Sequence, residues 1–227
     1  FEGVYMNAFV YVNGQLTAKN NYGYTPFYIC LNDYVRYGTE NEIRVLVRAG
    51  AMPNSRWYSG AGIYRDVYLL TGGLTHLIPG GIRIHTEQAD DDIAVIQIDA
   101  EINNRNYENI EFNMVTTIID QGQNKVAENT VPLMLGGNEQ NTFSQHLTIE
   151  RALLWDDEVP NLYSCRITLE SSGTGKKLDE DMEIFGIRTV SLDSVRGFCV
   201  NNKPEKLRGA CIHHDSGILG TATYDDV

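Results

Sequence analysis

The sequence predicts an all-β protein. Apolar and polar residues alternate with a period of two in most apolar segments, which is the pattern of half-buried strands. These segments are short and are separated by glycine, asparagine and aspartate, which are typical turn residues. Helical periodicity is scarce along the chain. The organisation is therefore expected to be one of packed sheets.

The first 73 residues contain three strand signals. The stretch AFVYVNGQLTA has two β-rich arms around Asn13-Gly14, the strongest short signal for a hairpin. Residues 41–50, NEIRVLVRAG, alternate with a period of two and predict a half-buried strand. RDVYLLTGG, residues 65–73, predicts another strand closed by glycines, and a long irregular loop precedes it.

Seven segments between about Thr75 and Val190 predict an antiparallel sandwich of immunoglobulin-like type. The Cys…Trp…Cys pattern of antibody domains is missing, so the inference covers the architecture alone. Alternation in IAVIQIDAEIN and YSCRITLE assigns one face of each strand to the core. The residues expected to face inward are Ile96, Ile98, Tyr163, Cys165 and Ile167.

The last part of the chain changes pattern again. GFCVNNKPEKLRGACIHHD predicts a hairpin turned at Asn201–Pro204, followed by a short apolar strand over Leu207–Ile212. No partner for that strand is evident in the sequence, which suggests a missing domain. The chain opens on a strand-like stretch without an initiator Met or a signal sequence, as a piece of a longer protein would. A periplasmic or secreted location and a cytoplasmic one therefore both stay open.

Composition excludes several partners. The formal net charge is −12 and no cluster of Lys and Arg offsets it, which argues against nucleic acid. No apolar run approaches the roughly 20 residues needed to span a membrane. The four cysteines form no CxxC pair, so buried free thiols are expected rather than a zinc site or a disulfide framework. Cys165 and Cys211 lie in apolar runs, which agrees with that expectation.

Three acidic clusters are the first candidates for catalysis, because many hydrolases, glycosidases among them, use paired carboxylates. They are residues 90–92, 156–158 and 179–181, and all are expected at strand junctions beside Gly, Pro or Lys. Exposed carboxylates lack the burial that shifts a pKa. These clusters are therefore interpreted as solvated turns.

The loop NSRWYSGAGIYRD is a stronger candidate for a binding site. It gathers Asn54, Arg56, Trp57 and Tyr58 beside glycines that let the backbone turn tightly. Flat aromatic rings next to an arginine fit a ring-shaped ligand rich in hydroxyl groups. The alternative is that Trp57 and Tyr58 fill a seam between domains. Both interpretations stay open on the residues alone.

The stretch GACIHHDSGILG contains two histidines and an aspartate. On a strand, His213 and Asp215 share one face. A metal site needs a third and usually a fourth ligand, and the other histidines are scattered through the sandwich strands. A ligand site at the carboxyl end of a strand is the simpler hypothesis.

Three stretches together resemble glycoside hydrolase family 2, which contains β-galactosidases, β-glucuronidases and β-mannosidases. They are GVYMNAFVYVNGQL to SRWYSGAGIYRDVYLL, then LLWDDEVPNLYSCRITL with FGIRTVSLD, and GFCVNNKPEKLRGACIHHDSGILG. The resemblance implies part of a jelly-roll sugar-binding domain in residues 1–73 and an immunoglobulin-like β-sandwich in residues 74–190. Residues 191–227 would begin a truncated (β/α)₈ barrel. The β-galactosidase-like branch fits best.

The resemblance also implies roles for single residues. His213 would lie in the sugar subsite of the barrel with Asp215 beside it, and Asn54, Arg56 and Trp57 would reach over the same pocket. The sequence departs from the glucuronidase and enteric galactosidase forms around residues 54–58. The acid/base and nucleophile glutamates are expected beyond Val227, because neither Asn-Glu pair, at 41–42 and 138–139, has a barrel context.

The sequence thus predicts the non-catalytic portion of a retaining glycoside hydrolase that cleaves β-glycosidic bonds and is inactive by itself. No cofactor is required, while a cation in the full enzyme and a homo-oligomer stay open. One alternative is a carbohydrate-binding sandwich protein without catalysis, and another is an adhesion or structural array. Neither alternative uses the stretch LRGACIHHD.

Overall fold

The computed structural model describes residues 1–50, 61–90 and 92–211. All regular secondary structure in these residues is β-strand. They contain no helix long and apolar enough to cross a membrane. Two compact units are present, one built from Phe1–Leu70 and the other from Thr71–Arg208. The all-β class predicted from the alternation is confirmed.

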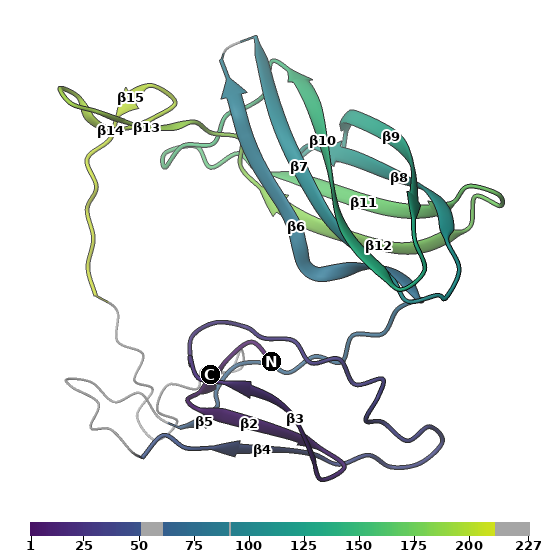
Figure 1. The fold of residues 1–227 in the computed structure, drawn as a ribbon. Coiled ribbons are helices and arrows are strands. Elements are labelled where there is room, and N and C mark those ends of the chain that lie inside the picture. The colour runs from purple at the N-terminus through teal and green to yellow at the C-terminus, as the bar shows by residue number, and fades with distance from the viewer. Residues whose placement is uncertain (51–60, 91, 212–227) are drawn as a thin grey trace. The chain divides into compact units, whose positions relative to one another are not determined.

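The larger unit contains a sandwich of two antiparallel sheets, visible as two layers in Figure 1. One sheet has the order β10-β7-β6 and the other the order β12-β11-β8-β9. Seven strands form it, as the spacing of the alternating segments predicts. They are β6 (Thr75–Ala89), β7 (Ile93–Asn104), β8 (Ile110–Ile119), β9 (Lys125–Leu135), β10 (Glu139–Glu150), β11 (Tyr163–Ser171) and β12 (Lys177–Phe185).

The core lies between the two sheets. Every second residue of β7 is fully buried, and β11 contributes its own alternate residues from the opposite sheet. The predicted inward set is confirmed: its five members are at most 4% exposed. Burial raises the pKa of the Cys165 thiol to about 12, helped by the charge of Glu183, so this thiol is unreactive at neutral pH.

Strand order departs from the constant-type immunoglobulin domain. The fourth strand, β9, pairs with β8 and so joins the larger sheet, leaving three strands in the other. One immunoglobulin feature is nevertheless present at the start of β11. The Tyr163 hydroxyl accepts a hydrogen bond from the backbone N–H of Leu153 at 2.8 Å, which forms a tyrosine corner.

Hydrogen bonds also cross the core. The side-chain amide of Gln145 on β10 donates to the Thr116 hydroxyl on β8 at 2.6 Å, and its carbonyl accepts from Asn129 on β9 at 3.1 Å. The backbone N–H of Leu77 on β6 donates to the Asp179 carboxylate on β12 at 2.8 Å. These bonds join the two sheets in places where apolar packing alone would allow them to slide.

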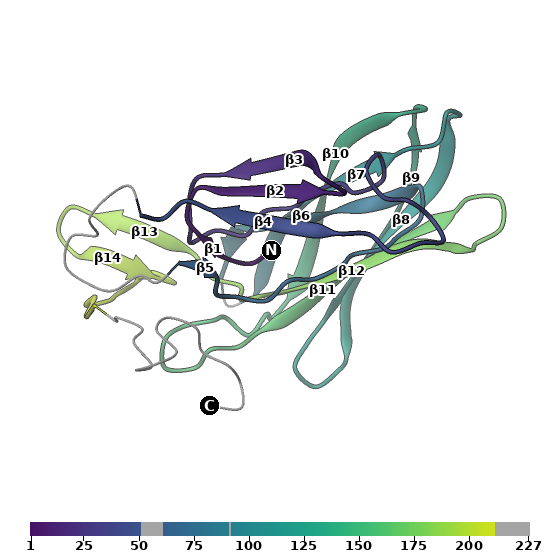
Figure 2. The same ribbon diagram turned by 90° about the horizontal axis from the view of Figure 1, so that it is seen from below.

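The smaller unit is built on a three-stranded sheet of order β3-β2-β4, whose strands lie side by side in Figure 2. The predicted hairpin is confirmed, because Asn13 and Gly14 both have positive φ angles, 50° and 82°, as a type I′ turn requires. The strands are β2 (Ala8–Val12), β3 (Gln15–Asn20) and β4 (Ile43–Val47), and a separate pair joins β1 (Val4–Tyr5) to β5 (Gly62–Ile63).

The predicted strand over residues 65–73 is wrong. This segment has no assigned strand, and Val67, Tyr68, Leu69 and Leu70 are all exposed. A run of apolar, β-prone residues becomes a strand only when a neighbouring backbone pairs with it. No described strand pairs with these residues.

A small sheet of order β13-β14-β15 follows the sandwich. Its second turn, at Asn201 and Asn202, confirms the predicted hairpin. Residues 207–211 form no strand, contrary to the prediction, and Leu207 is 74% exposed. Ile212 lies outside the described residues. Cys211 is exposed rather than buried, because the expected apolar strand does not form around it. The strands are β13 (Val190–Asp193), β14 (Gly197–Val200) and β15 (Lys203–Pro204).

The tyrosine corner generates a stability prediction. Tyr163→Phe should lower the free energy of unfolding of the sandwich by about 1–3 kcal/mol, because the Leu153 N–H loses its acceptor in a partly buried place. Tyr107→Phe removes a hydroxyl from a side chain that is 92% exposed and should change stability by less than about 0.5 kcal/mol. Chemical denaturation of both variants makes the comparison. Equal effects would mean that the corner contributes nothing.

Candidate functional site

The residues predicted to touch a sugar lie outside the described part of the chain. Asn54, Arg56 and Trp57 fall in residues 51–60, and His213 and Asp215 fall in residues 212–227. The prediction that these five residues share one site therefore stays a prediction. What it does describe is the two flanks of residues 51–60.

The flank that follows residues 51–60 is tied to the start of the chain. β5 pairs antiparallel with β1, with Val4 opposite Ile63 and Tyr5 opposite Gly62. The pairing continues beyond the strands, where the N–H of Tyr64 donates to the Gly3 carbonyl at 3.2 Å. Gly62 has a φ of 107°, a conformation that glycine adopts without strain.

Four aromatic rings gather around this flank. We call Tyr5, Tyr22, Tyr24 and Tyr64 the tyrosine cluster. Tyr24 lies at its centre, with ring centroids 5.4 Å from Tyr5, 5.6 Å from Tyr22 and 6.5 Å from Tyr64, all edge to face. This geometry is the favoured one for aromatic pairs. Tyr5 is buried, while Tyr22 and Tyr24 are 59% and 43% exposed, so the cluster runs from the core to the surface.

Hydrogen bonds fix the cluster to the backbone. The Tyr64 hydroxyl donates to the Gly23 carbonyl at 2.8 Å, and Arg65 donates to the Tyr24 carbonyl at 3.3 Å. The Arg65 guanidinium also lies 5.1 Å from the centre of the Tyr64 ring. Partial burial raises the pKa of Tyr64, and the positive charge of Arg65 opposes this rise. The phenol therefore stays a neutral hydrogen-bond donor at neutral pH.

The other flank of residues 51–60 is tied to the same N-terminal stretch. Arg48 donates its N–H to the Asn7 carbonyl at 3.3 Å and accepts from the Asn7 side chain at 3.2 Å. Its guanidinium lies 5.1 Å from the centre of the Phe9 ring. Both flanks are thus anchored to residues 3–9.

The acidic clusters serve structural roles. Asp90 accepts from the N–H groups of Asp92 and Ile93, and Asp156 accepts from Glu158 and Val159, as turn residues do. The expectation that residues 179–181 lie at a strand junction is wrong, because they lie within β12. They fit there because β12 is an edge strand: Asp179 accepts the Leu77 N–H bond from β6, while Glu180 is exposed to solvent and discourages pairing with other chains.

The two Asn-Glu pairs have structural roles as well. Asn41 binds the backbone of Arg36 in both directions and accepts from the Asn13 side chain. Glu139 accepts from the N–H of Gly136 at 2.7 Å. Within the ranges that the structure describes, no group of three His, Cys, Asp or Glu side chains could hold a metal ion.

A shallow hollow of about 400 Å³ lies beside the turn of the first hairpin. Its amides already bind one another and the backbone, which leaves them no free donors for a ligand. Its lining residues are Asn13, Arg36, Glu40, Asn41 and Glu42.

Sequence reasoning missed the tyrosine cluster, although a signal was available. Ten of the chain's 13 tyrosines lie in the first 70 residues. Such an enrichment indicates a surface on which aromatic rings face both apolar groups and water.

Packing around the cluster generates a second prediction. Gly23→Ala should destabilise the smaller unit by about 1–3 kcal/mol, because the new methyl group would lie 3.1 Å from the Tyr5 Cα and against its ring. Gly50→Ala is the matched control, since none of the described residues lies within 4 Å of the added group. Hydrogen exchange at the amides of β1 and β2 measures the effect, and sandwich amides should not respond. Equal exchange in both variants would contradict the packing argument.

Comparison with known proteins identifies the family. Residues 76–188 match the model of glycosyl hydrolases family 2. The chain is 34% identical over 222 residues to a β-galactosidase of Bacteroides ovatus, an alignment that covers 98% of the chain and 26% of that protein. A β-galactosidase of Thermoanaerobacter pseudethanolicus is 29% identical over 237 residues, with 100% and 30% covered.

Solved structures agree with this assignment. A glycosyl hydrolase family 2 member from Bacteroides cellulosilyticus superposes with a TM-score of 0.92 at 34% identity, covering 100% of this chain and 31% of that one. A β-glucuronidase of Bacteroides uniformis gives a TM-score of 0.89 at 27% identity, covering 99% and 28%. The chain thus spans about a quarter to a third of the length of these relatives. It belongs to glycosyl hydrolases family 2.

Proposed function

We propose that this chain is the non-catalytic portion of a retaining glycoside hydrolase that cleaves β-glycosidic bonds, with a β-galactoside as the favoured substrate. The observation that carries the proposal is the match of nearly the whole chain to about a quarter of a β-galactosidase. A β-glucuronide is the competing substrate class, because a β-glucuronidase has a similar fold. The proposal needs no cofactor and is compatible with a homo-oligomer and with a cation elsewhere in the enzyme.

The catalytic pair of this mechanism requires two carboxylates about 5 Å apart across one glycosidic bond. One must be protonated to act as the general acid, which calls for a raised pKa. One acid of each cluster, Asp90, Asp156 or Asp179, accepts hydrogen bonds from the backbone. We therefore expect both glutamates beyond Val227, in a barrel that residues 191–227 would begin.

Substrate contacts are proposed for five residues. Asn54, Arg56 and Trp57 would reach the sugar from a loop whose flanks are both anchored to residues 3–9. His213 and Asp215 would meet it from the carboxyl end of the first barrel strand. Anchored flanks support this role, because a contact residue held by a rigid scaffold loses less entropy on binding.

A second function is favoured by one observation. The rings of Tyr22 and Tyr24 are partly exposed and meet edge to face, which leaves aromatic surface open to the apolar face of a sugar. A carbohydrate-binding protein without catalysis would need no more than such a surface. The adhesion or structural array has no comparable support.

The chain by itself should turn over no glycoside. Hydrolysis needs a proton donor and a nucleophile on opposite sides of one bond, and the described acids offer no such pair. The purified chain is incubated with chromogenic β-galactoside, β-glucuronide and β-mannoside, and release of the chromophore is followed. Release that disappears when one of the chain's own acids is replaced would overturn the proposal.

In the longer enzyme, Trp57→Ala and Arg56→Ala should each raise KM about tenfold, which corresponds to a loss of roughly 1.4 kcal/mol of binding. The melting temperature should change far less, because the predicted role of these residues is contact with substrate rather than packing. Tyr37→Ala, at an exposed tyrosine of the same unit, is the control and should change neither quantity. A normal KM with a lower melting temperature would support the seam-filling alternative instead.

A further inference from the structure

The β13–β15 sheet has little apolar packing to hold it in place. Its strands are four, four and two residues long. Leu192 and Val195 are 85% and 91% exposed, and only Cys199 and Val200 of its strands are buried. Apolar burial on this scale stabilises a position weakly, so its attachment to the sandwich must depend on specific contacts.

Those contacts gather at Trp155, in the connection between β10 and β11. The N–H of Trp155 donates to the Ile187 carbonyl at 2.8 Å, and Ile187 itself is fully buried in the sandwich core. Gly186 lies against the tryptophan so closely that an added Cβ would be 2.8 Å from the Trp155 Cβ. The Arg188 guanidinium lies 4.8 Å from the ring centre. Trp155 is therefore held in one position on the sandwich.

Asn201, in the turn between β14 and β15, binds this fixed point. Its side-chain amide donates to the Trp155 carbonyl at 2.9 Å, and its side-chain carbonyl accepts from the N–H of Thr189 at 3.0 Å. Its backbone N–H donates to the Thr189 carbonyl at 2.9 Å. One residue thus joins the second turn of the sheet to the sandwich and to the segment that leaves it.

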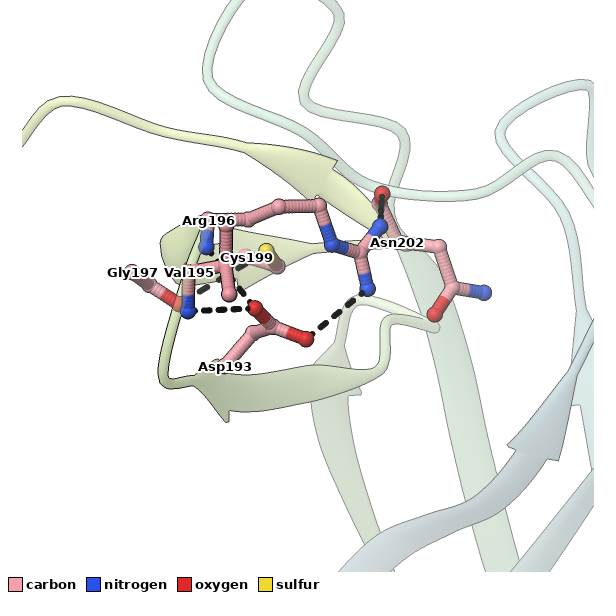
Figure 3. Close-up of polar contacts among 6 residues, drawn as sticks. All are labelled: Asp193, Val195, Arg196, Gly197, Cys199 and Asn202. Atoms are coloured by element: carbon pink, nitrogen blue, oxygen red, sulfur yellow. Dashed lines mark hydrogen bonds and ion pairs between the residues drawn. The ribbon is translucent and has the colours of Figure 1, made fainter.

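The sheet is also braced internally, as Figure 3 shows. One carboxylate oxygen of Asp193 accepts from the N–H groups of Val195 and Arg196, and the other lies 3.5 Å from the Arg196 guanidinium. The same guanidinium donates to the Asn202 carbonyl at 3.2 Å in the second turn. The Arg196 guanidinium thus bridges the two turns of the sheet.

We propose that Asn201 is a positioning residue that locks the β13–β15 sheet to the sandwich through Trp155, and so sets the direction in which the chain leaves the sandwich. Without the lock, the sheet would pivot about residues 186–189 while keeping its own structure.

Three variants distinguish the effect of the Asn201 side-chain bonds from the effect of the turn conformation. Asn201→Gly removes both side-chain bonds, and glycine accepts the positive φ of 49° without strain. Asn201→Asp keeps an acceptor for Thr189 but places a carboxylate oxygen against the Trp155 carbonyl. Asn202→Gly is the matched control, because Asn202 has a φ of 63° in the same turn and uses only its backbone carbonyl among the described contacts.

Hydrogen exchange of the whole chain, read by mass spectrometry or NMR, is the measurement. Asn201→Gly and Asn201→Asp should each speed exchange at least about tenfold at the Thr189, Asn201 and Trp155 amides, and tryptic cleavage after Arg188 should accelerate alongside. Amides of β7 and β11 should keep the protection of the parent chain. Asn202→Gly should leave both regions unchanged.

Three results would overturn the proposal. An equal effect of Asn202→Gly would assign the attachment to the turn conformation rather than to the Asn201 side chain. Unchanged exchange in Asn201→Asp would show that the bond to Trp155 is not what holds the sheet. Loss of protection in β7 and β11 together with the sheet would make Asn201 a residue of general stability instead of a positioning residue.

Discussion

The packing of β7 against β8 and β11 across the sandwich is the interaction on which the larger unit depends. Alternate residues of β7 from Ala94 to Ile102 are fully buried against the inward residues of the other sheet. A slip of one residue would turn this whole set to solvent, so the core fixes the register of every neighbouring strand. The tyrosine corner, the Gln145 bridge and the Asp179 bond all require that register. The position of Trp155 depends on the core through its bond to Ile187, and the position of the β13–β15 sheet depends on Trp155.

The smaller unit is held together differently. Its buried apolar residues are few, and many large apolar side chains stay exposed on its surface. Aromatic and cation–π contacts supply part of the stabilisation that a larger apolar core would give. Phe1 stacks on Phe27 at 5.2 Å, and Lys19 and Arg48 both approach the Phe9 ring. Because such contacts are weak one by one, this unit depends on several of them together with the Tyr64 and Arg65 bonds.

The period-two alternation and the turn residues correctly predicted the features that depend on neighbouring residues in the sequence. The Asn13-Gly14 hairpin, the seven sandwich strands and the inward faces follow from residues close together in the chain. The strands expected at 65–73 and 207–211 failed because apolar alternation indicates a surface to bury, while a strand also needs a partner that no local pattern supplies. The tyrosine cluster joins residues about 40 positions apart, so composition could signal it but spacing could not. The predicted sugar contacts lie in residues that the structure does not describe.

Six carboxyl groups of the described residues have a lowered pKa, the direction opposite to that of a general acid. Hydrogen bonds from backbone and side-chain donors lower the pKa of several carboxyl groups, and each such group stabilises the fold in its charged form. That stabilisation is complete above the ordinary pKa of 3.8 to 4.5 and is lost as the pH falls below it. A glycosidase acid must instead hold its proton near neutral pH, which requires burial in an apolar pocket. Carboxyl groups with a lowered pKa are therefore unsuited to the general-acid role in the proposed mechanism. The groups with a lowered pKa are Asp90, Asp99, Asp120, Glu128, Glu180 and Asp193.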